Sequence, residues 1–394
     1  MTSENAPLKV RFELLLVRAY THWLNFLLDT LRRLLLLNRQ TEARHILIYK
    51  IGNIGDITCA MPAFIAIRKH FSNSRITLLT SPGRLGSFGA KELLTDVPYL
   101  DDMTVYFAED IATWQKKKEF VEQLRSKKFD LFIQLPDDIA KFRTLLRNML
   151  FAKSLGVRRA FGFTIRAIRL FKKTQIDFTA NQTEVESLLE LLRAHGIPSH
   201  AAEFEFNISD GIKEKIRQLL TADPSIHNAS FIVALSPGGK REANRWPVER
   251  FSETARYLKK KYNAHIVILG GPGDIGLGEA IGRQLPREHF SNQCGKLELL
   301  ETVEFLRHSR LIIANSTGTI HLAAAVGTPA VGIYGVRDIF NRWFPYGAQH
   351  HVLYHKFLNC DYHKEECIKK SIDMVTVPEV EAACDEILKK DEEC

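Results

Sequence analysis

Glycines and small polar residues follow three apolar runs in the C-terminal half of the chain, and this pattern is suited to binding an anion. The first set, Asn315 to Gly318, lies between the apolar run 311–314 and an Ala-rich segment that ends at Gly327. Ser316 or Thr317 can cap a helix, Gly318 lets the backbone approach a ligand, and the free N–H groups of a first helical turn attract negative charge. A phosphate is the obvious ligand. An ordinary capped helix in an α/β core is the alternative.

Two further loops have the same character. The run 231–235 ends in Ser-Pro-Gly-Gly at 236–239, and the run 266–269 ends in Gly-Gly-Pro-Gly-Asp at 270–274. Neither loop has the GxxxxGK[ST] pattern of a P-loop or the GxGxxG pattern of a dinucleotide fold. Because the carboxyl ends of parallel strands meet at one edge of a sheet, the three loops can bring backbone N–H groups to one crevice.

Alternating apolar runs and helical segments predict parallel sheets in two domains. In the N-terminal half the runs are 45–50, 75–80 and 130–135, and a polar stretch at 199–210 is the expected crossing between domains. We therefore expect an N-terminal helical segment at 1–44, a first domain at 45–205, a second at 206–375 and a closing helix within 376–394. The closing helix could pack back on the first domain.

Composition narrows the classes of partner. The 394 residues carry a formal net charge of +8, which favours an acidic partner such as a phosphorylated substrate, an anionic membrane or nucleic acid. No nucleic-acid recognition motif is present. Six cysteines without a CxxC pair indicate a reducing, cytoplasmic setting. Cys360 and Cys367 could bind a metal with His355 or His363, but thiols without a metal are expected on this spacing.

The segment 10–37 is rich in Leu and aromatic residues but is interrupted by charges, which argues against a membrane-spanning helix. It also lacks a signal-peptide cleavage site. The pattern favours an amphipathic helix that lies on an anionic bilayer or packs on the core of the protein itself.

A second basic segment could bind an acceptor, although a solvated face is expected. Its basic residues are Arg158, Arg159, Arg166, Arg169, Lys172 and Lys173.

Four ordered motifs resemble those of the bacterial lipopolysaccharide heptosyltransferase family. Residues 51–56, Ile-Gly-Asn-Ile-Gly-Asp with Pro62 downstream, look like the GxxGD loop of the family. Residues 236–239 followed by Arg-Trp-Pro-Val-Glu-Arg-Phe at 245–251 are similar to its PGA and KRWPxERF segments. The loop 270–274 and the stretch 315–321, with Gly-Thr-Pro at 327–329, complete the match. The resemblance runs from about His45 to the end of the chain.

The resemblance implies a GT-B fold, an α/β class in which two Rossmann-like domains face each other across a cleft. It implies inverting transfer of a heptose-like sugar from ADP-heptose to a lipopolysaccharide core or related glycolipid. Asp56 would then be the general base, although an Asp near a helix start is by itself more often a cap. No metal is implied, and no cofactor besides the nucleotide sugar, which is a substrate.

The same resemblance nominates binding residues. The leaving diphosphate would lie against Gly238, Gly239, Thr317 and Gly318, with added charge from Lys240 or Arg241. Asp274 would approach the adenosine ribose, and Ser316 and His321 belong to the donor-site motif. Position alone nominates three residues for the acceptor side: Gly52, Asn53 and Arg143.

Two positions depart from the family pattern. Ser316 stands where the family usually has Asp, and Asn244 stands where it usually has Lys. One change removes a negative charge and the other a positive charge, so they could compensate around an altered donor. We expect a cytoplasmic, peripheral membrane glycosyltransferase. The alternatives are an enzyme with a different nucleotide-sugar donor and a catalytically silent GT-B binding or scaffold protein.

Overall fold

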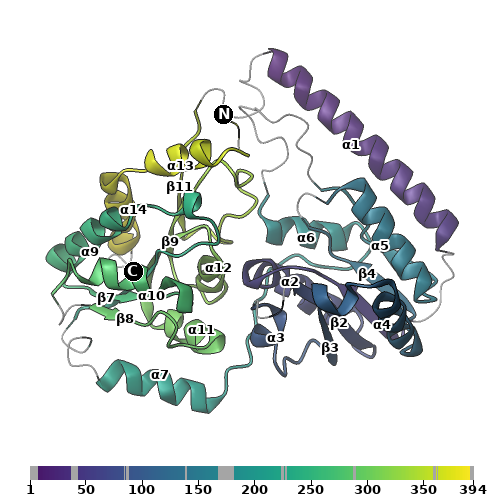
Figure 1. The fold of residues 1–394 in the computed structure, drawn as a ribbon, viewed down its shortest axis with the longest axis horizontal. Helices are drawn as coiled ribbons and strands as arrows, with labels where there is room; N and C mark the ends of the chain where they lie inside the picture. Colours follow the sequence, from purple (N-terminus) through teal and green to yellow (C-terminus); the bar gives the residue numbers. More distant parts are fainter. Residues whose placement is uncertain are drawn as a thin grey trace. The chain divides into compact units, whose positions relative to one another are not determined.

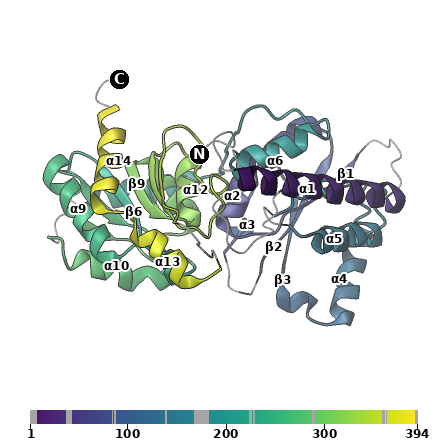
Figure 2. The same cartoon turned by 90° about the horizontal axis from the view of Figure 1, so that it is seen from above.

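The computed structural model describes residues 8–36, 43–83, 85, 88–137, 140–166, 182–222, 226, 229–286, 290–357, 361 and 363–390. The chain divides into two compact units. Unit 1 comprises Met1–Phe171 and Ile176–Glu205, and unit 2 comprises Lys172–Gln175 and Phe206–Cys394. Each unit is a parallel sheet covered by helices (Figures 1 and 2).

Unit 1 has five parallel strands in the order β3-β2-β1-β4-β5. The strands are β1 (His45–Tyr49), β2 (Arg75–Gly83), β3 (Asp102–Phe107), β4 (Leu131–Gln134) and β5 (Arg159–Phe161). The helices are α2 (Ile54–His70), α3 (Ala90–Leu93), α4 (Trp114–Ser126), α5 (Phe142–Ser154) and α6 (Glu184–Arg193), with a 3-10 turn η2 (Ala108–Ile111). Because β1 lies between β2 and β4, the direction of winding reverses at β1, and ligands of such sheets bind beyond the strand ends at this point.

Unit 2 has six parallel strands in the order β11-β10-β9-β6-β7-β8. They are β6 (Ile232–Ser236), β7 (His265–Ile268), β8 (Phe290–Asn292), β9 (Ser309–Asn315), β10 (Ala330–Tyr334) and β11 (His351–Tyr354). The helices are α7 (Asp210–Ala222), α9 (Val248–Tyr262), α10 (Ile275–Gly282), α11 (Leu299–Arg307), α12 (Gly318–Ala325), α13 (Glu365–Asp373) and α14 (Val377–Lys390), with 3-10 turns η3 (Glu242–Asn244) and η4 (Pro272–Asp274). Here the reversal lies between β6 and β9.

Helix α14 belongs to the core of unit 2. Its buried residues Val380, Cys384 and Ile387 join one apolar cluster with Phe251 of α9 and Val331 of β10. Their spacing of three and four residues gives the helix one apolar face, and α9 and the sheet cover it. The apolar face of this helix therefore packs on the second domain.

Helix α1 (Leu8–Leu35) packs on unit 1 along one face. Leu24 and Leu28 are buried in the same apolar cluster as residues of α5. The Asn25 side chain exchanges two hydrogen bonds with the backbone of Ile165, donating from Nδ2 to the carbonyl oxygen (3.1 Å) and accepting at Oδ1 from the N–H (2.8 Å). Packing on the protein's own core is thus confirmed for this face.

A second face of α1 is apolar but exposed. Its side chains follow the helical spacing of three and four residues over most of the helix. They are Phe12, Leu15, Leu16, Tyr20, Trp23, Phe26 and Leu34. No helix in the described ranges is both long enough and apolar enough to cross a membrane.

The two faces of α1 predict opposite effects of the same substitution. Leu28 is 0% exposed, and Leu28→Ala should lower the free energy of unfolding by about 2–5 kcal/mol because it leaves a cavity. Leu34 is 73% exposed, so Leu34→Ala should change that free energy by about 0.5 kcal/mol at most. Urea denaturation followed by circular dichroism measures both. Equal, small effects would contradict the packing of α1 on unit 1.

Candidate functional site

The loop after β1 holds a carboxylate over a glycine. Asp56 is the third residue of α2, and its Oδ2 accepts a hydrogen bond from the backbone N–H of Asn53 at 3.0 Å. Gly52 has a φ of +154°, and a Cβ at this position would lie 2.2 Å from the Asp56 Cβ. Any side chain at 52 would displace the carboxylate. The glycine is therefore required where the Asp56 side chain folds back.

Burial raises the pKa of Asp56 to about 6. The positive charge of Lys50 and the hydrogen bond from Asn53 act in the opposite direction and lower this pKa, whereas the negative charges of Asp137 and Glu184 raise it further. A carboxyl group with a pKa near 6 is ionised at neutral pH and can still take up a proton. Asp56 thus has the acid–base properties that a general base needs.

The charges that act on Asp56 belong to a cluster in which Lys50, Glu184 and Arg166 are buried and Asp137 is exposed. The Nζ of Lys50 is 3.6 Å from Asp137 Oδ1 and 3.9 Å from Glu184 Oε1. Arg166 donates two hydrogen bonds to Glu184, from Nη1 to Oε2 (2.8 Å) and from Nη2 to Oε1 (2.7 Å). Charges of both signs are needed here because an isolated buried charge would be costly.

The expectation that Arg166 belongs to a solvated face is wrong. Its side chain is buried, because the buried Glu184 needs an opposite charge. Arg158 is exposed and Arg159 is half-buried. The other basic residues of that segment, Arg169, Lys172 and Lys173, lie outside the described residues.

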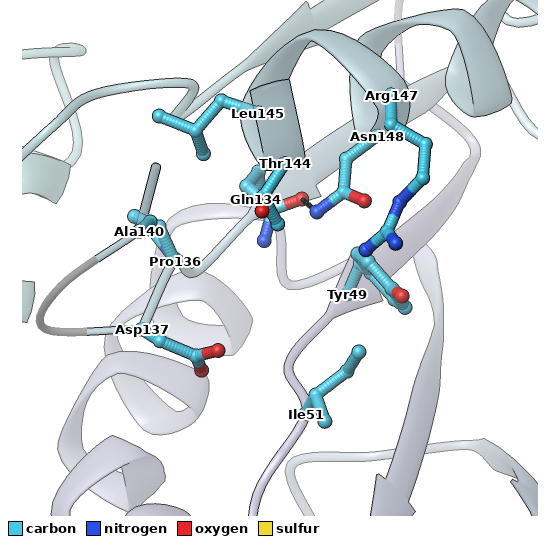
Figure 3. Close-up of a pocket in the computed structure, with 10 residues that line it drawn as sticks. All are labelled: Tyr49, Ile51, Gln134, Pro136, Asp137, Ala140, Thr144, Leu145, Arg147 and Asn148. Carbon is cyan, nitrogen blue, oxygen red and sulfur yellow. Dashed lines mark hydrogen bonds between the residues drawn. The ribbon is translucent and has the colours of Figure 1, made fainter. Parts of the chain in front are cut away.

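A cavity of about 50 Å³ lies at the reversal point of unit 1, between the ends of β1 and β4 and the start of α5 (Figure 3). Its lining is largely polar. The lining residues are Tyr49, Ile51, Gln134, Pro136, Asp137, Ala140, Thr144, Leu145, Arg147 and Asn148. Asn148 Nδ2 donates to Gln134 Oε1 at 3.1 Å, and Arg147 extends towards Tyr49 in Figure 3.

The arginine in this cavity differs from the one nominated from the sequence. Both arginines are exposed, but Arg143 lies one turn earlier on α5 and is not among the lining residues. Thr144, Arg147 and Asn148 share the helical spacing of three and four residues and face the strand ends. Arg143 and Arg147 are themselves four residues apart, so the spacing alone does not distinguish them.

In unit 2, Asn315 joins three segments around the reversal point. Its side chain is fully buried, and Nδ2 donates to the carbonyl oxygens of Pro237 (2.7 Å) and Gly238 (3.2 Å). Its Oδ1 accepts from the N–H of Trp246 at 3.0 Å. The loop after β9 is thus tied to the loop after β6 and to the Arg-Trp-Pro segment. The sequence showed Asn315 as part of a polar turn but not as this link.

Asp274 lies against two of the predicted loops. Its Oδ2 accepts from the N–H of Gly271 at 3.0 Å. A Cβ on Gly238 would lie 2.6 Å from both carboxylate oxygens of Asp274, and a Cβ on Gly270 would lie 2.7 Å from its Cβ. The structure therefore brings together Gly238 and Asp274, which the sequence nominated for one ligand.

The start of α12 offers polar groups to a ligand. Thr317 precedes the helix but its side chain does not cap it, and within the described part of the chain the buried Thr317 Oγ1 has no hydrogen-bond partner. Gly318 opens the helix, and Ser316 donates its N–H to the Ile333 carbonyl oxygen at 3.1 Å. First-turn N–H groups and a hydroxyl are groups of the kind that can bind an anion.

The remaining nominated residues surround these loops. Lys240 and Arg241 are exposed, and Arg241 Nη1 is 3.9 Å from Glu365 Oε1. Gly239 accepts two hydrogen bonds at its carbonyl oxygen from Arg245 (3.0 and 2.7 Å). His321 is buried on α12, with its ring 6.0 Å from that of Trp343.

The residues considered for a metal site are only partly described. Cys360 lies outside the described residues, and His355 Nε2 lies 2.9 Å from Glu379 Oε1. In the described part of the chain no group of three or more His, Cys, Asp or Glu residues could hold a metal ion.

The sequence of the chain matches a known family of proteins. Residues 118–372 match the model of glycosyltransferase family 9 (heptosyltransferase). The chain is 22% identical over 308 residues to the lipopolysaccharide core heptosyltransferase OpsX of Haemophilus influenzae, covering 76% of this chain and 81% of that protein.

Solved structures share the fold. A glycosyltransferase family 9 protein from Veillonella parvula has a TM-score of 0.70 at 19% identity and covers 89% of this chain and 99% of its own. E. coli heptosyltransferase WaaC with ADP-2-deoxy-2-fluoro heptose has a TM-score of 0.58 at 16% identity, with coverage of 87% and 99%. The predicted α/β, GT-B class with Rossmann-like domains is confirmed. The family model matches more than half of this chain, so the chain belongs to glycosyltransferase family 9, the heptosyltransferases.

Proposed function

We propose that this glycosyltransferase moves a heptose-like sugar from ADP-heptose to a lipopolysaccharide core or related glycolipid, with inversion at the anomeric carbon and Asp56 as general base. The observation that carries the proposal is the position of Asp56. It lies just beyond the end of β1, at the reversal point of its sheet, with a pKa near 6, and the charge of Asp137, which lines the polar cavity, acts on it.

The reaction needs one proton acceptor and one leaving-group site. An acceptor hydroxyl attacks the anomeric carbon while Asp56 takes its proton, and the bond from that carbon to the nucleotide diphosphate breaks with both electrons leaving on the diphosphate. The first-turn N–H groups of α12 and the Thr317 hydroxyl are suited to the departing negative charge. Gly238 and Gly239 let the diphosphate approach the backbone, and Lys240 or Arg241 adds positive charge.

The donor assignment rests on the family and on the unit 2 loops. E. coli WaaC, which has the same fold, was solved with an ADP-heptose analogue. In this chain Asp274 lies against the loop after β6, where a carboxylate can accept hydrogen bonds from ribose hydroxyls. Ser316 and Asn244 differ from the usual family residues beside this loop, and a different sugar or nucleotide is the alternative that they favour.

The unit 1 cavity suits part of an anionic, hydroxylated acceptor. Arg147 supplies positive charge, and Thr144, Gln134 and Asn148 supply hydroxyl and amide groups. Asp137 lines the cavity and also acts electrostatically on Asp56, so a saccharide bound here would be near the base. Gly52 and Asn53 contribute the backbone of the loop that leads from β1 to Asp56.

We also propose that α1 rests on the anionic inner face of the cytoplasmic membrane. Its exposed face carries Trp23, Tyr20 and Phe26, residue types that insert at the interface of a bilayer. The exposed Arg18 and Arg33 can contact anionic headgroups. A glycolipid acceptor would be held at the same surface.

Substitution of the proposed base should strongly lower turnover without weakening the binding of the donor. Asp56→Asn should lower kcat by about 10²- to 10⁴-fold, because the amide cannot accept the acceptor proton. In the unsubstituted enzyme, kcat/KM should fall as the pH drops below about 6, since protonation of Asp56 removes the base. Unchanged turnover in the variant would remove Asp56 from this role.

Donor binding is the control for that experiment. In a calorimetric or thermal-shift screen of nucleotide sugars, ADP-heptose should bind the unsubstituted protein and Asp56→Asn with similar affinity. A preference for a uridine or guanosine donor would contradict the ADP-heptose assignment. Failure to bind any nucleotide sugar would favour the silent scaffold.

Two arginines of α5 form a matched pair for the acceptor. Arg147→Ala should raise the KM for a lipopolysaccharide-core acceptor by about tenfold to a hundredfold, because a charged hydrogen-bond donor is lost from the cavity. Arg143→Ala should leave this KM within about twofold, since surface charges outside a site contribute little. A larger rise of the KM in Arg143→Ala than in Arg147→Ala would identify Arg143 as the acceptor residue. It would also contradict acceptor binding in the cavity.

Membrane binding should depend on the outer face of α1. Trp23→Gln combined with Phe26→Gln should weaken binding to phosphatidylglycerol-containing vesicles by about tenfold or more, because two exposed aromatic side chains would no longer be buried in lipid. Trp114→Gln, at an exposed tryptophan on α4, is the control and should leave binding unchanged. Vesicle sedimentation measures both. Equal binding by all three proteins would exclude α1 as the membrane contact.

A further inference from the structure

A buried lysine beside the active-site loop has charged neighbours but no hydrogen bond. Lys50 follows β1, its side chain is 0% exposed, and in the described part of the chain its Nζ has no hydrogen-bond partner. The nearest carboxylate oxygens, on Asp137 and Glu184, are 3.6 and 3.9 Å away. A buried ammonium group is costly unless a nearby charge compensates it. The presence of a buried ammonium group at this position therefore needs a functional explanation.

Neither carboxylate is fully engaged with Lys50. Glu184 gives both oxygens to Arg166 at 2.7 and 2.8 Å, so its charge is largely balanced by that guanidinium. Asp137 is 55% exposed, and water screens its charge. Part of the positive charge of Lys50 is therefore left to act on other groups, and Asp56 lies six residues later, in the first turn of α2.

The fold fixes this cluster firmly. Thr183 caps α6, with Oγ1 accepting from the Glu186 N–H (3.3 Å) and its own N–H donating to Glu186 Oε2 (2.7 Å). The cap makes Glu184 the first residue of α6, which packs against α2. Arg166 is held further by Ser187 Oγ at 3.2 Å and by the Pro136 carbonyl oxygen. Glu184 and Arg166 thus form a rigid support on one side of Lys50.

We propose that Lys50 is a positioning residue for the transfer reaction, and that its buried charge, supported by Glu184 and Arg166, keeps the Asp56 carboxylate ionised until an acceptor hydroxyl is bound. This inference rests on the proposed role of Asp56 as base. The charged groups that act electrostatically on Asp56 are Lys50 at the end of β1, Asp137 from the loop after β4 and Glu184 from α6. Within α2, Cys59 is buried near the same charges, and burial raises the pKa of its thiol, so it stays neutral.

The signs of the two charges give opposite predictions. A positive charge favours the ionised form of Asp56, so Lys50→Met should move the acid limb of the pH profile of kcat/KM upward by about one pH unit. A negative charge disfavours the ionised form, so Glu184→Gln should move the same limb downward by about one pH unit or less. Lys50→Arg keeps the charge and should return the limb close to its original position.

Measurements of donor affinity and thermal unfolding distinguish this role of Lys50 from a purely structural one. Each variant should bind ADP-heptose with unchanged affinity and melt cooperatively, because the donor loops lie in unit 2. If Glu184→Gln does not fold, Asp137→Asn removes a negative charge from a half-exposed position and should also move the limb downward. Folded Lys50→Met and Asp137→Asn proteins with an unmoved limb would overturn the proposal.

Failure of the inference is distinguishable from failure of the proposed function. Active Asp56→Asn would show that Asp56 is not the base, whatever Lys50 does. Inactive Asp56→Asn together with an unmoved limb in Lys50→Met would keep Asp56 as base and reject only the role of Lys50.

Discussion

An aspartate that folds back over a glycine onto the start of its own helical segment is the interaction on which both candidate sites depend. Asp56 does this over Gly52 in unit 1, and its Oδ2 accepts from Asn53 N–H at 3.0 Å. Asp274 does it in unit 2, accepting from Gly271 N–H at 3.0 Å. Asp56 occupies the space that a side chain on Gly52 would fill, and Asp274 occupies the space that side chains on Gly238 and Gly270 would fill. The glycines are therefore part of the chemistry of both loops.

The two aspartates differ in their surroundings, and this difference separates their roles. Around Asp56, burial outweighs the favourable effects of Lys50 and Asn53 and raises its pKa to about 6. Asp274 instead lies between two glycine-containing loops, against Gly238 of the loop after β6 and Gly270 of the loop after β7. The same local arrangement thus places one aspartate in a buried, charged environment and the other between two glycine-containing loops.

The sequence predicted the central strands and the loops that follow them, but not the edges of the sheets. The central strands are buried on both faces and read as continuous apolar runs. The strands that sequence reasoning missed are the edge strands of the two sheets, β3, β5, β8 and β11. They are partly exposed, and two of them have three residues, so they carry little apolar pattern.

Contacts between side chains that are far apart in the sequence could not be predicted from the sequence either. The pairing of Lys50 with Glu184 depends on how α6 packs against α2, and no local pattern encodes it. Choosing Arg147 over Arg143 required the rotation of α5 about its axis, which its neighbours in the fold determine. Loop positions follow from strand order, whereas side-chain contacts need the packed structure.

Helix α1 shows the limit of periodicity most clearly. A helix needs one apolar stripe to pack on a core, and Val17, Leu24 and Leu28 supply it. Phe12, Trp23 and Phe26 lie on another face and would cost nothing in packing if they were polar. The packing of α1 on unit 1 therefore does not account for these apolar residues, and large exposed apolar faces of this kind are typical of interaction surfaces.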